Sequence, residues 1–325
     1  MVDAVSVRED GFAEMAYIGQ KPWHGLGQEL EENQPIEVWM KAAGMDWVVE
    51  DSPVIFNYVD KNGDVQRGLF DDKKTLIRSD TKAPLSVVGR KYHVVHPGEV
   101  LEFFRDLTYM NDMRLSTAGV LFGGRRFWAL AEIGENFELA SGDQIKGNLL
   151  LTTSVDGTLA TTAKFVSTRV VCNNTLSWAL NREQGQMVKV SHRSEFNPED
   201  VKIDMGVYSD SWNEFTSNVT VLSRTKVNAK KAKQFFDEMS TNGKGEVSRL
   251  KVERLDNFYR NGQGADLSKG TAWGLLNAVT EMYTHGTNQT KGDNSNKFWS
   301  AYNGVWSNEK TKAYQLLMEK YAKAA

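Results

Sequence analysis

The chain of 325 residues contains a single cysteine, Cys172. It therefore cannot form an intramolecular disulfide or a zinc site built from cysteines. No run of about 18 apolar residues occurs, so the sequence predicts no membrane-spanning helix and no membrane partner. The first ten residues lack the basic segment and apolar run of a signal peptide. These absences favour a protein of a reducing cytoplasm.

The chain also lacks an excess of positive charge. Its 39 Lys and Arg residues are outnumbered by 42 Asp and Glu residues, and the net charge is −3. Such a chain has no overall attraction to nucleic acid or to an anionic membrane, so a site for a polyanion has to be a local patch.

Familiar catalytic signatures are missing as well. There is no Gly-Lys-Ser/Thr of a phosphate loop, no Gly-x-Ser-x-Gly elbow and no Gly-x-Gly-x-x-Gly after a strand. His93 and His96 are three residues apart, but they flank a strand end and a Pro-Gly turn and need not share a face. We therefore expect no enzyme, no catalytic residues, no metal site and no cofactor.

The stretch from Gly123 to Arg182 carries the clearest structural pattern. It predicts strands at Arg125–Ile133, Lys146–Val155 and Thr158–Phe165, because these runs are rich in β-branched, aromatic and apolar residues. Asp156-Gly157 between the last two is a typical two-residue hairpin turn, in which both positions favour a positive φ.

From about Val166 the spacing of apolar residues changes from two to 3.6 and predicts a helix. Cys172, Leu176 and Ala179 would lie on its apolar face, which makes Cys172 a small core residue. The opposite stripe is polar and contains Arg169 and Asn173.

Proline is absent after Pro198, and residues 199–325 have helical spacing. We therefore predict an α+β protein with an antiparallel twisted sheet and a β-β-β-α core, followed by a helical C-terminal region. The predicted domains are a β-rich domain over residues 1–197 and a helical domain over residues 198–325. Further expected elements are helices at 36–43 and 99–108 and strands at 47–60, 75–80, 85–90, 115–122 and 187–191.

Basic residues recur along the central strands. They can be solvated residues that protect a sheet edge, or they can form a track for a phosphate backbone. In the second interpretation the candidate nucleic-acid-binding residues are Arg125, Arg126, Lys146, Lys164, Arg169 and Asn173. Phe127 and Trp128 follow the arginine pair, and alternation allows at most one of them to stack on a base.

A second basic segment lies between Arg224 and Arg260. It has ten Lys or Arg residues against five Asp or Glu residues, in contrast to the acidic chain around it. The candidate secondary patch consists of Arg224, Lys226, Lys230, Lys231 and Lys233.

Four sequence runs resemble a known family: Trp23–Gly27, Ser154–Thr158, Arg169–Leu176 and Gly270–Glu281. Together they are similar to the phage/plasmid-like protein family, a domain of unknown function (DUF932). The resemblance spans about residues 20–310. It implies an origin in mobile elements of a bacterial host cell, without implying an activity.

The order of the predicted elements is also similar to the β-β-β-α core of single-strand annealing proteins such as RecT, Redβ and Erf. That likeness implies a basic groove between hairpin sheet and helix, and subunits that assemble into rings or filaments. It leads us to expect a DNA-binding protein that anneals single strands in phage or plasmid DNA recombination, as a homo-oligomer and without a cofactor.

An alternative from another class stays open. The chain can instead be a mobile-element protein that binds a host or replication protein and has no affinity for nucleic acid. This alternative predicts an exposed aromatic patch, for example around Trp299, Tyr302 and Trp306.

Overall fold

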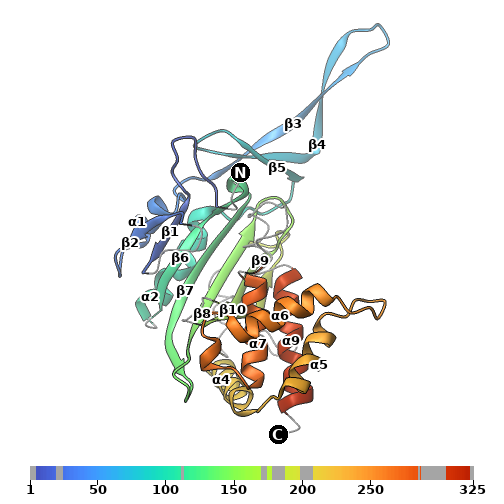
Figure 1. The fold of residues 1–325 in the computed structure, drawn as a ribbon. Coiled ribbons are helices and arrows are strands. Elements are labelled where there is room, and N and C mark those ends of the chain that lie inside the picture. The colour runs from blue at the N-terminus through green and yellow to red at the C-terminus, as the bar shows by residue number, and fades with distance from the viewer. Residues whose placement is uncertain are drawn as a thin grey trace. The chain divides into compact units, whose positions relative to one another are not determined.

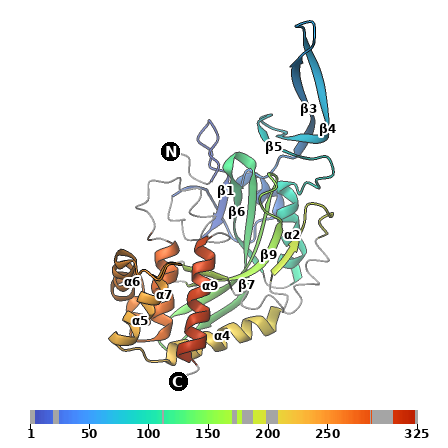
Figure 2. The ribbon, with the colours of Figure 1, turned by 90° about the vertical axis from the view of Figure 1, so that its right-hand side faces the viewer.

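The computed structural model describes residues 5–19, 25–110, 113–169, 174–177, 187–197, 208–284, 286 and 305–322. It contains two β-sheets, and helices make up the described C-terminal part (Figures 1 and 2). The predicted α+β class with a helical C-terminal region is thus confirmed. Within these described ranges, no helix has the length and apolar character needed to cross a membrane.

The larger sheet has the strand order β10-β9-β8-β7-β6-β1-β2, and β11 pairs with β9. Neighbouring strands run antiparallel where β1 meets β6, β6 meets β7 and β9 meets β10, whereas β1 and β2 are parallel. The strands are β1 (Met15–Ile18), β2 (Gln28–Leu30), β6 (Arg114–Leu121), β7 (Arg126–Glu138), β8 (Gln144–Ser154), β9 (Thr161–Arg169), β10 (Asn174–Ser177) and β11 (Met187–Val190). The three strands predicted for the central stretch correspond to β7, β8 and β9.

The helix predicted from Val166 is wrong wherever the structure describes that segment. β9 continues to Arg169, and β10 returns beside it with Val166 opposite Ser177. The β-branched residues around Val166 favour a strand because their χ1 freedom is restricted in a helix. Cys172, Asn173 and Ala179, which the helix would have contained, lie outside the described residues.

The turn between β8 and β9 also differs from the expected geometry in one detail. Gly157 has a φ of 73°, as predicted, whereas Asp156 has no positive φ. The Asp156 carboxylate instead accepts a hydrogen bond from the backbone N–H of Thr158 at 3.0 Å. The side chain thus forms the turn that a positive φ at Asp156 would otherwise provide.

The smaller sheet has three antiparallel strands in the order β3-β4-β5, namely β3 (Val49–Val59), β4 (Val65–Arg78) and β5 (Pro84–Gly89). β5 pairs with β4 only between Lys73 and Ile77, so residues 54–72 form a two-stranded ribbon that we call the arm. Figures 1 and 2 both show β3 and β4 extending well beyond β5. The Asp60 carboxylate accepts the N–H groups of Asn62 and Asp64 and closes the predicted turn.

Two helices accompany the N-terminal strands: α1 (Ile36–Ala42) and α2 (Pro97–Met110). They contact each other, and α2 also contacts β6. Phe103 and Phe104 of α2 are fully buried. Gly44, with a φ of 64°, ends the first helix as the sequence predicts.

The C-terminal helices are α4 (Tyr208–Arg224), α5 (Ala229–Met239), α6 (Arg249–Asn261), α7 (Ala272–Thr284) and α9 (Val305–Leu317). α7 is the centre of this group. Its residues from Ala272 to Tyr283 are all buried, and it contacts α4, α6, α9 and β10. The indole N–H of Trp273 donates to the buried Asp143 carboxylate at 2.8 Å, which ties α7 to the turn before β8.

The chain divides into two compact units. Unit 1 comprises Met1–Glu132, Leu149–Ala163 and Met187–Asp204; unit 2 comprises Ile133–Asn148, Lys164–Gln186 and Met205–Ala325. The units are not separated by one cut, because β7, β8 and β9 each give residues to both. The division into a domain of residues 1–197 and a domain of residues 198–325 stays a prediction.

Candidate nucleic-acid interface

The predicted arginine pair follows a tight turn between β6 and β7. Phe122, Gly123 and Gly124 have positive φ values of 56°, 68° and 105°. A Cβ atom at Gly124 would lie 3.1 Å from atoms of Trp47, Arg78 and Leu85, so this position needs glycine for space as well as for backbone conformation. The turn brings Arg125 to the surface of unit 1.

Arg125 and Arg126 have different surroundings. Arg125 is exposed, and its Nε donates to the carbonyl of Phe122 at 3.2 Å. Arg126 lies over the Phe122 ring at 4.7 Å, and its Nη2 donates to the hydroxyl of Thr158 at 3.0 Å. Arg125 is therefore the member of the pair that can reach a ligand in solvent.

The charge of Arg126 is partly compensated within the protein. Its Nε lies 3.9 Å from the Asp156 carboxylate, and both side chains are only 17% exposed. Burial lowers the pKa of Arg126, while Asp156 raises it and the neighbouring charge of Arg125 lowers it further. Arg126 thus secures the β8–β9 turn, which limits its use as a phosphate contact.

Neither aromatic residue after the pair is available for stacking. Phe127 is 0% exposed and Trp128 is 1% exposed. The two rings point to opposite faces of the sheet, and both faces are buried at this point.

The other central candidates belong to unit 2. Lys146, the third residue of β8, is half-buried, and Lys164 in β9 is buried. Arg169 is the last residue of β9, but its side chain is outside the described part, as is the whole of Asn173. A shared groove for these residues and the arginine pair of unit 1 stays a prediction.

Sequence reasoning missed the neighbour of Lys164. Lys310 in α9 is 1% exposed, and its Nζ donates to the hydroxyl of Thr284 at 2.8 Å. Burial and then the charge of Lys164 lower the pKa of Lys310 to about 7. Two lysines close together in the core of unit 2 leave no sequence signal, because Lys310 stands in an ordinary amphipathic pattern.

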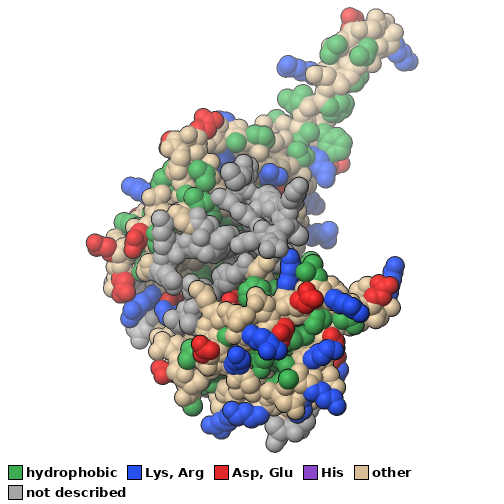
Figure 3. Space-filling view, viewed as in Figure 1, with side chains coloured by type: hydrophobic (Ala, Val, Ile, Leu, Met, Phe, Trp, Pro, Cys, Tyr) green, Lys and Arg blue, Asp and Glu red, His purple; other side chains and the backbone are tan. Residues whose placement is uncertain are grey.

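The secondary patch is the best exposed of the predicted basic sites. Arg224 ends α4, Lys226 lies in the connection, and Lys230, Lys231 and Lys233 are on α5; all five side chains are exposed. Lys233 pairs with Asp237 at 3.4 Å. For the other four, no acidic partner within 4.0 Å occurs among the described residues. Figure 3 shows Lys and Arg side chains over the helices of unit 2, with acidic residues between them.

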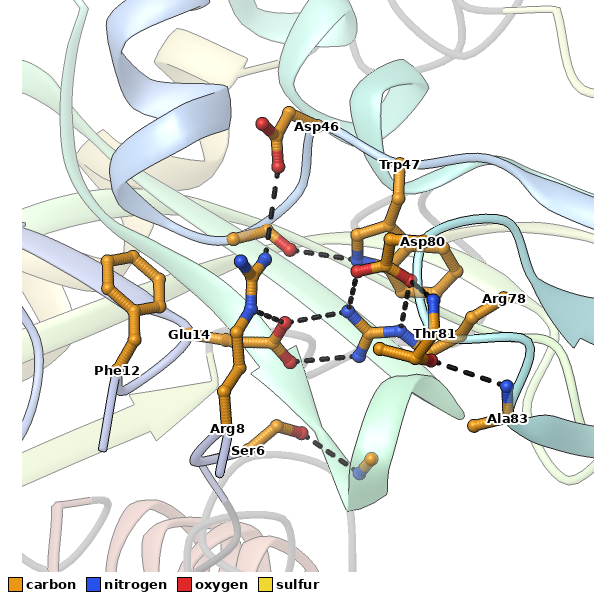
Figure 4. A network of polar contacts seen from close by, with 12 residues as sticks. Ser6, Arg8, Phe12, Glu14, Asp46, Trp47, Arg78, Asp80, Thr81 and Ala83 are labelled. Atoms are coloured by element: carbon orange, nitrogen blue, oxygen red, sulfur yellow. Dashed lines mark hydrogen bonds and ion pairs between the residues drawn. The ribbon is translucent and has the colours of Figure 1, made fainter. Parts of the chain in front are cut away.

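A buried charge network in unit 1 is a further feature that the sequence did not reveal (Figure 4). The Arg78 guanidinium donates to Glu14 at 2.7 and 3.0 Å and to Asp80 at 2.8 and 3.0 Å. It also lies 4.1 Å from the Trp47 ring, and Arg8 donates to Glu14 at 2.8 Å.

The network joins the segment before β1 to the end of β4 and the turn that follows it. Burial lowers the pKa of Arg78, but the hydrogen bonds and charges of Glu14 and Asp80 outweigh it, so the net pKa is raised. Since each of the three guanidinium nitrogens donates to Glu14 or Asp80, we regard Arg78 as a structural residue.

Of the histidine pair considered for a metal, His96 has another role, whereas His93 is exposed. The Nδ1 of His96 accepts the N–H of Val49 at 3.1 Å. His192 stacks on Tyr92 at 4.5 Å, and its ring nitrogens lie 3.0 and 2.9 Å from the carbonyl oxygens of His93 and Leu159. Among the described residues, no three His, Cys, Asp or Glu side chains are grouped so as to hold a metal ion.

Comparison with known proteins gives one result about ancestry. No curated protein and no solved structure matches the chain. A family model described as a domain of unknown function, DUF932, matches residues 84–312, which is more than half of the sequence. The chain therefore belongs to the DUF932 family.

Proposed function

We propose that the protein binds single-stranded DNA and promotes the annealing of complementary strands in a phage or plasmid recombination system. The observation that carries the proposal is the secondary patch. Four of its exposed cations, Arg224, Lys226, Lys230 and Lys231, have no acidic partner in the described part of the chain. Each such cation can displace a condensed counterion from a phosphate backbone.

The protein acts by holding the DNA strand in position, and this mechanism needs no cofactor. The end of α4 and the first turn of α5 offer charge but no aromatic platform, so the backbone is held and the bases stay accessible to a second strand. The exposed Arg125 of unit 1 is a separate candidate contact. Assembly of several copies would lengthen the stretch of DNA that is held.

A salt titration with a labelled oligonucleotide tests the proposal. We expect a Kd of about 1 µM or tighter at low salt, with an affinity that falls as salt rises. The double variant Lys230→Glu/Lys231→Glu should weaken binding about tenfold. It should also reduce the slope of log K against log salt by about 1.4, since each phosphate contact on a single strand contributes about 0.7.

A matched control uses two exposed lysines of unit 1, Lys41→Glu/Lys91→Glu, which changes the net charge equally. If both variants lose affinity alike, binding follows net charge and the patch is not the site. If the wild-type protein does not bind at about 50 mM salt, the function itself is wrong.

The alternative function is binding of a host or replication protein. Of its proposed aromatic patch, Trp299 and Tyr302 lie outside the described residues, and Trp306 is half-buried at the start of α9. The exposed apolar side chains of the arm favour a protein partner more directly. This alternative predicts no affinity for the oligonucleotide at any salt concentration.

A further inference from the structure

The arm concentrates exposed apolar side chains. In the part of the chain that the structure describes, fourteen large hydrophobic residues are exposed, and half of them lie between residues 54 and 72: Ile55, Phe56, Tyr58, Val59, Val65, Leu69 and Phe70. Val59 and Val65 are 66% and 70% exposed. Figure 3 shows hydrophobic side chains along the arm. Clusters of this kind mark interaction surfaces.

The two faces of the arm differ in character. Opposite residues in an antiparallel ribbon share a face, so Ile55 with Leu69 and Val59 with Val65 lie on one face, and the polar pair of Asn57 with Arg67 lies between them. The other face is aromatic: Phe56 and Tyr58 have ring centroids 6.1 Å apart, and the Phe56 ring lies where a Cβ of Gly68 would be. A flat partner surface could cover only one of these faces.

The outer edge of β3 has no described neighbour, because β3 ends the strand order of its sheet. Residues 54–59 read Val-Ile-Phe-Asn-Tyr-Val, without a charge. An uncharged edge of this composition is prone to pair with another strand. The arm as a whole has four acidic residues and two basic ones, so a nucleic acid is a poor occupant.

The side chains of this edge are arranged symmetrically about Asn57. An aromatic residue stands on either side of it, and an aliphatic residue stands beyond each aromatic one. We propose that the edge of β3 pairs antiparallel with the same edge of a second copy of this chain, and that Asn57 faces Asn57 of the partner subunit. Phe56 then faces Tyr58 of the partner subunit, and Ile55 faces Val59 of the partner subunit.

Neighbouring registers fit less well. In a dimer with a twofold axis perpendicular to the sheet, the side chains of one face lie on the same side in both subunits. The axis therefore passes through a residue, and the registers next to Asn57 have the axis at Phe56 or at Tyr58. With the centre at Tyr58, Phe56 faces Asp60 of the partner subunit; with the centre at Phe56, Ile55 faces Asn57 of the partner subunit. Only the register at Asn57 pairs aromatic with aromatic and aliphatic with aliphatic residues across the junction. Pro53, which has no N–H to donate, ends the ladder.

Disulfide trapping tests this register. In a Cys172→Ser background, Asn57→Cys places two thiols directly opposite, at a Cα separation of about 4.5–5.5 Å that a disulfide can bridge. We expect a covalent dimer under mild oxidation. Asn62→Cys in the turn is the control, because in this register the two thiols would be about ten residues apart along the ladder, roughly 33 Å.

Light scattering on the full chain supplies the second readout. We expect the wild-type protein to have the mass of a dimer at micromolar concentration. Tyr58→Lys should weaken the dimer at least tenfold, whereas Val65→Lys on β4, which lies away from the paired edge of β3, should change the dimer Kd less than twofold. Both residues are exposed, so the two variants should melt like the wild-type protein.

A monomeric wild-type protein, equal effects of the two lysine variants, or failure of the Asn57→Cys variant to cross-link would overturn the proposal. The inference does not depend on DNA binding. A chain that dimerises through β3 but ignores oligonucleotides would support it and would reject the proposed function alone.

Discussion

At the scale of single residues, burial decides which charged side chains can reach a ligand in solvent. Arg125 and Arg126 stand where a basic track was predicted, but only Arg125 is exposed. The burial of Lys164 could not be predicted, because β9 is buried on both faces from Thr161 to Ser167 and has no alternation of polar and apolar residues. A lysine within such a strand has the same sequence signature as one on a half-exposed strand.

We predict that Lys310 makes stability depend on pH. Its pKa of about 7 in the folded protein is below the usual value of about 10.4 in the unfolded chain. Between these values the unfolded state binds more protons, so the free energy of unfolding should rise with pH, by at most about 1.4 kcal/mol per unit. Below pH 7 the full cost of charging Lys310 is present.

Urea denaturation of the wild-type protein and of Lys310→Met at about pH 7 and pH 9 checks this. The gain in stability between the two pH values should be smaller in the variant, since methionine does not titrate. Parallel behaviour of the two proteins would show that Lys310 keeps an ordinary pKa in the folded state.

We also predict a large effect of Arg78→Met. The substitution leaves Glu14, which is 1% exposed, with Arg8 as its one charged partner among the described residues. Removal of one member of a buried pair typically costs about 3–5 kcal/mol. Arg78→Met/Glu14→Leu should cost less than Arg78→Met alone, because the buried Glu14 carboxylate that loses its main partner is then removed as well.

Chemical denaturation of these variants should be compared with Arg114→Met. Arg114 and Glu32 form a pair at 3.7 Å in which both side chains are about 65% exposed, so its loss should change stability by less than about 0.5 kcal/mol. Similar losses from Arg78→Met and Arg114→Met would contradict a structural role for the buried network.

At the scale of elements, strands and turns with local signals were predictable. The turn at Asn62-Gly63 and the helix end at Gly44 follow from backbone preferences of a few residues. The error at Val166 has a different origin. The spacing of three apolar residues favours a helix, whereas the β-branched run before them favours a strand. The pairing with β10 that decides between the two is a tertiary contact.

The turn between β6 and β7 gives a prediction at this scale. Gly124→Ala should destabilise the protein by more than Gly123→Ala. Both glycines have a positive φ, but only at Gly124 would the new methyl group meet neighbours at 3.1 Å. We expect about 1 kcal/mol for Gly123→Ala from backbone strain and about 2–3 kcal/mol for Gly124→Ala. Equal midpoints of thermal unfolding would contradict this account.

At the scale of the whole molecule, the net charge of −3 did not predict where cations gather, because the secondary patch is local. The sequence contrast after Pro198 marked the onset of the helical part. This contrast could not show that unit 2 also includes Ile133–Asn148, since that depends on contacts between distant segments.

We predict that the arm is dispensable for folding. Replacement of residues 54–73 by Asn-Gly would join Pro53 to Lys74, which are opposite each other, through a favoured hairpin turn. The shortened chain should melt within a few degrees of the wild-type protein and should be monomeric by light scattering. Loss of the folded state would show that the arm also stabilises unit 1.

The contact between Trp273 and Asp143 has a consequence for biosynthesis. The two residues are separated by 130 positions in the chain. A ribosome that adds about 5–20 residues per second needs on the order of ten seconds to pass from one to the other. During this interval Asp143, in the turn of the nascent β7–β8 hairpin, lacks its partner Trp273, and chaperones that recognise unpacked apolar strands can bind the hairpin before α7 emerges.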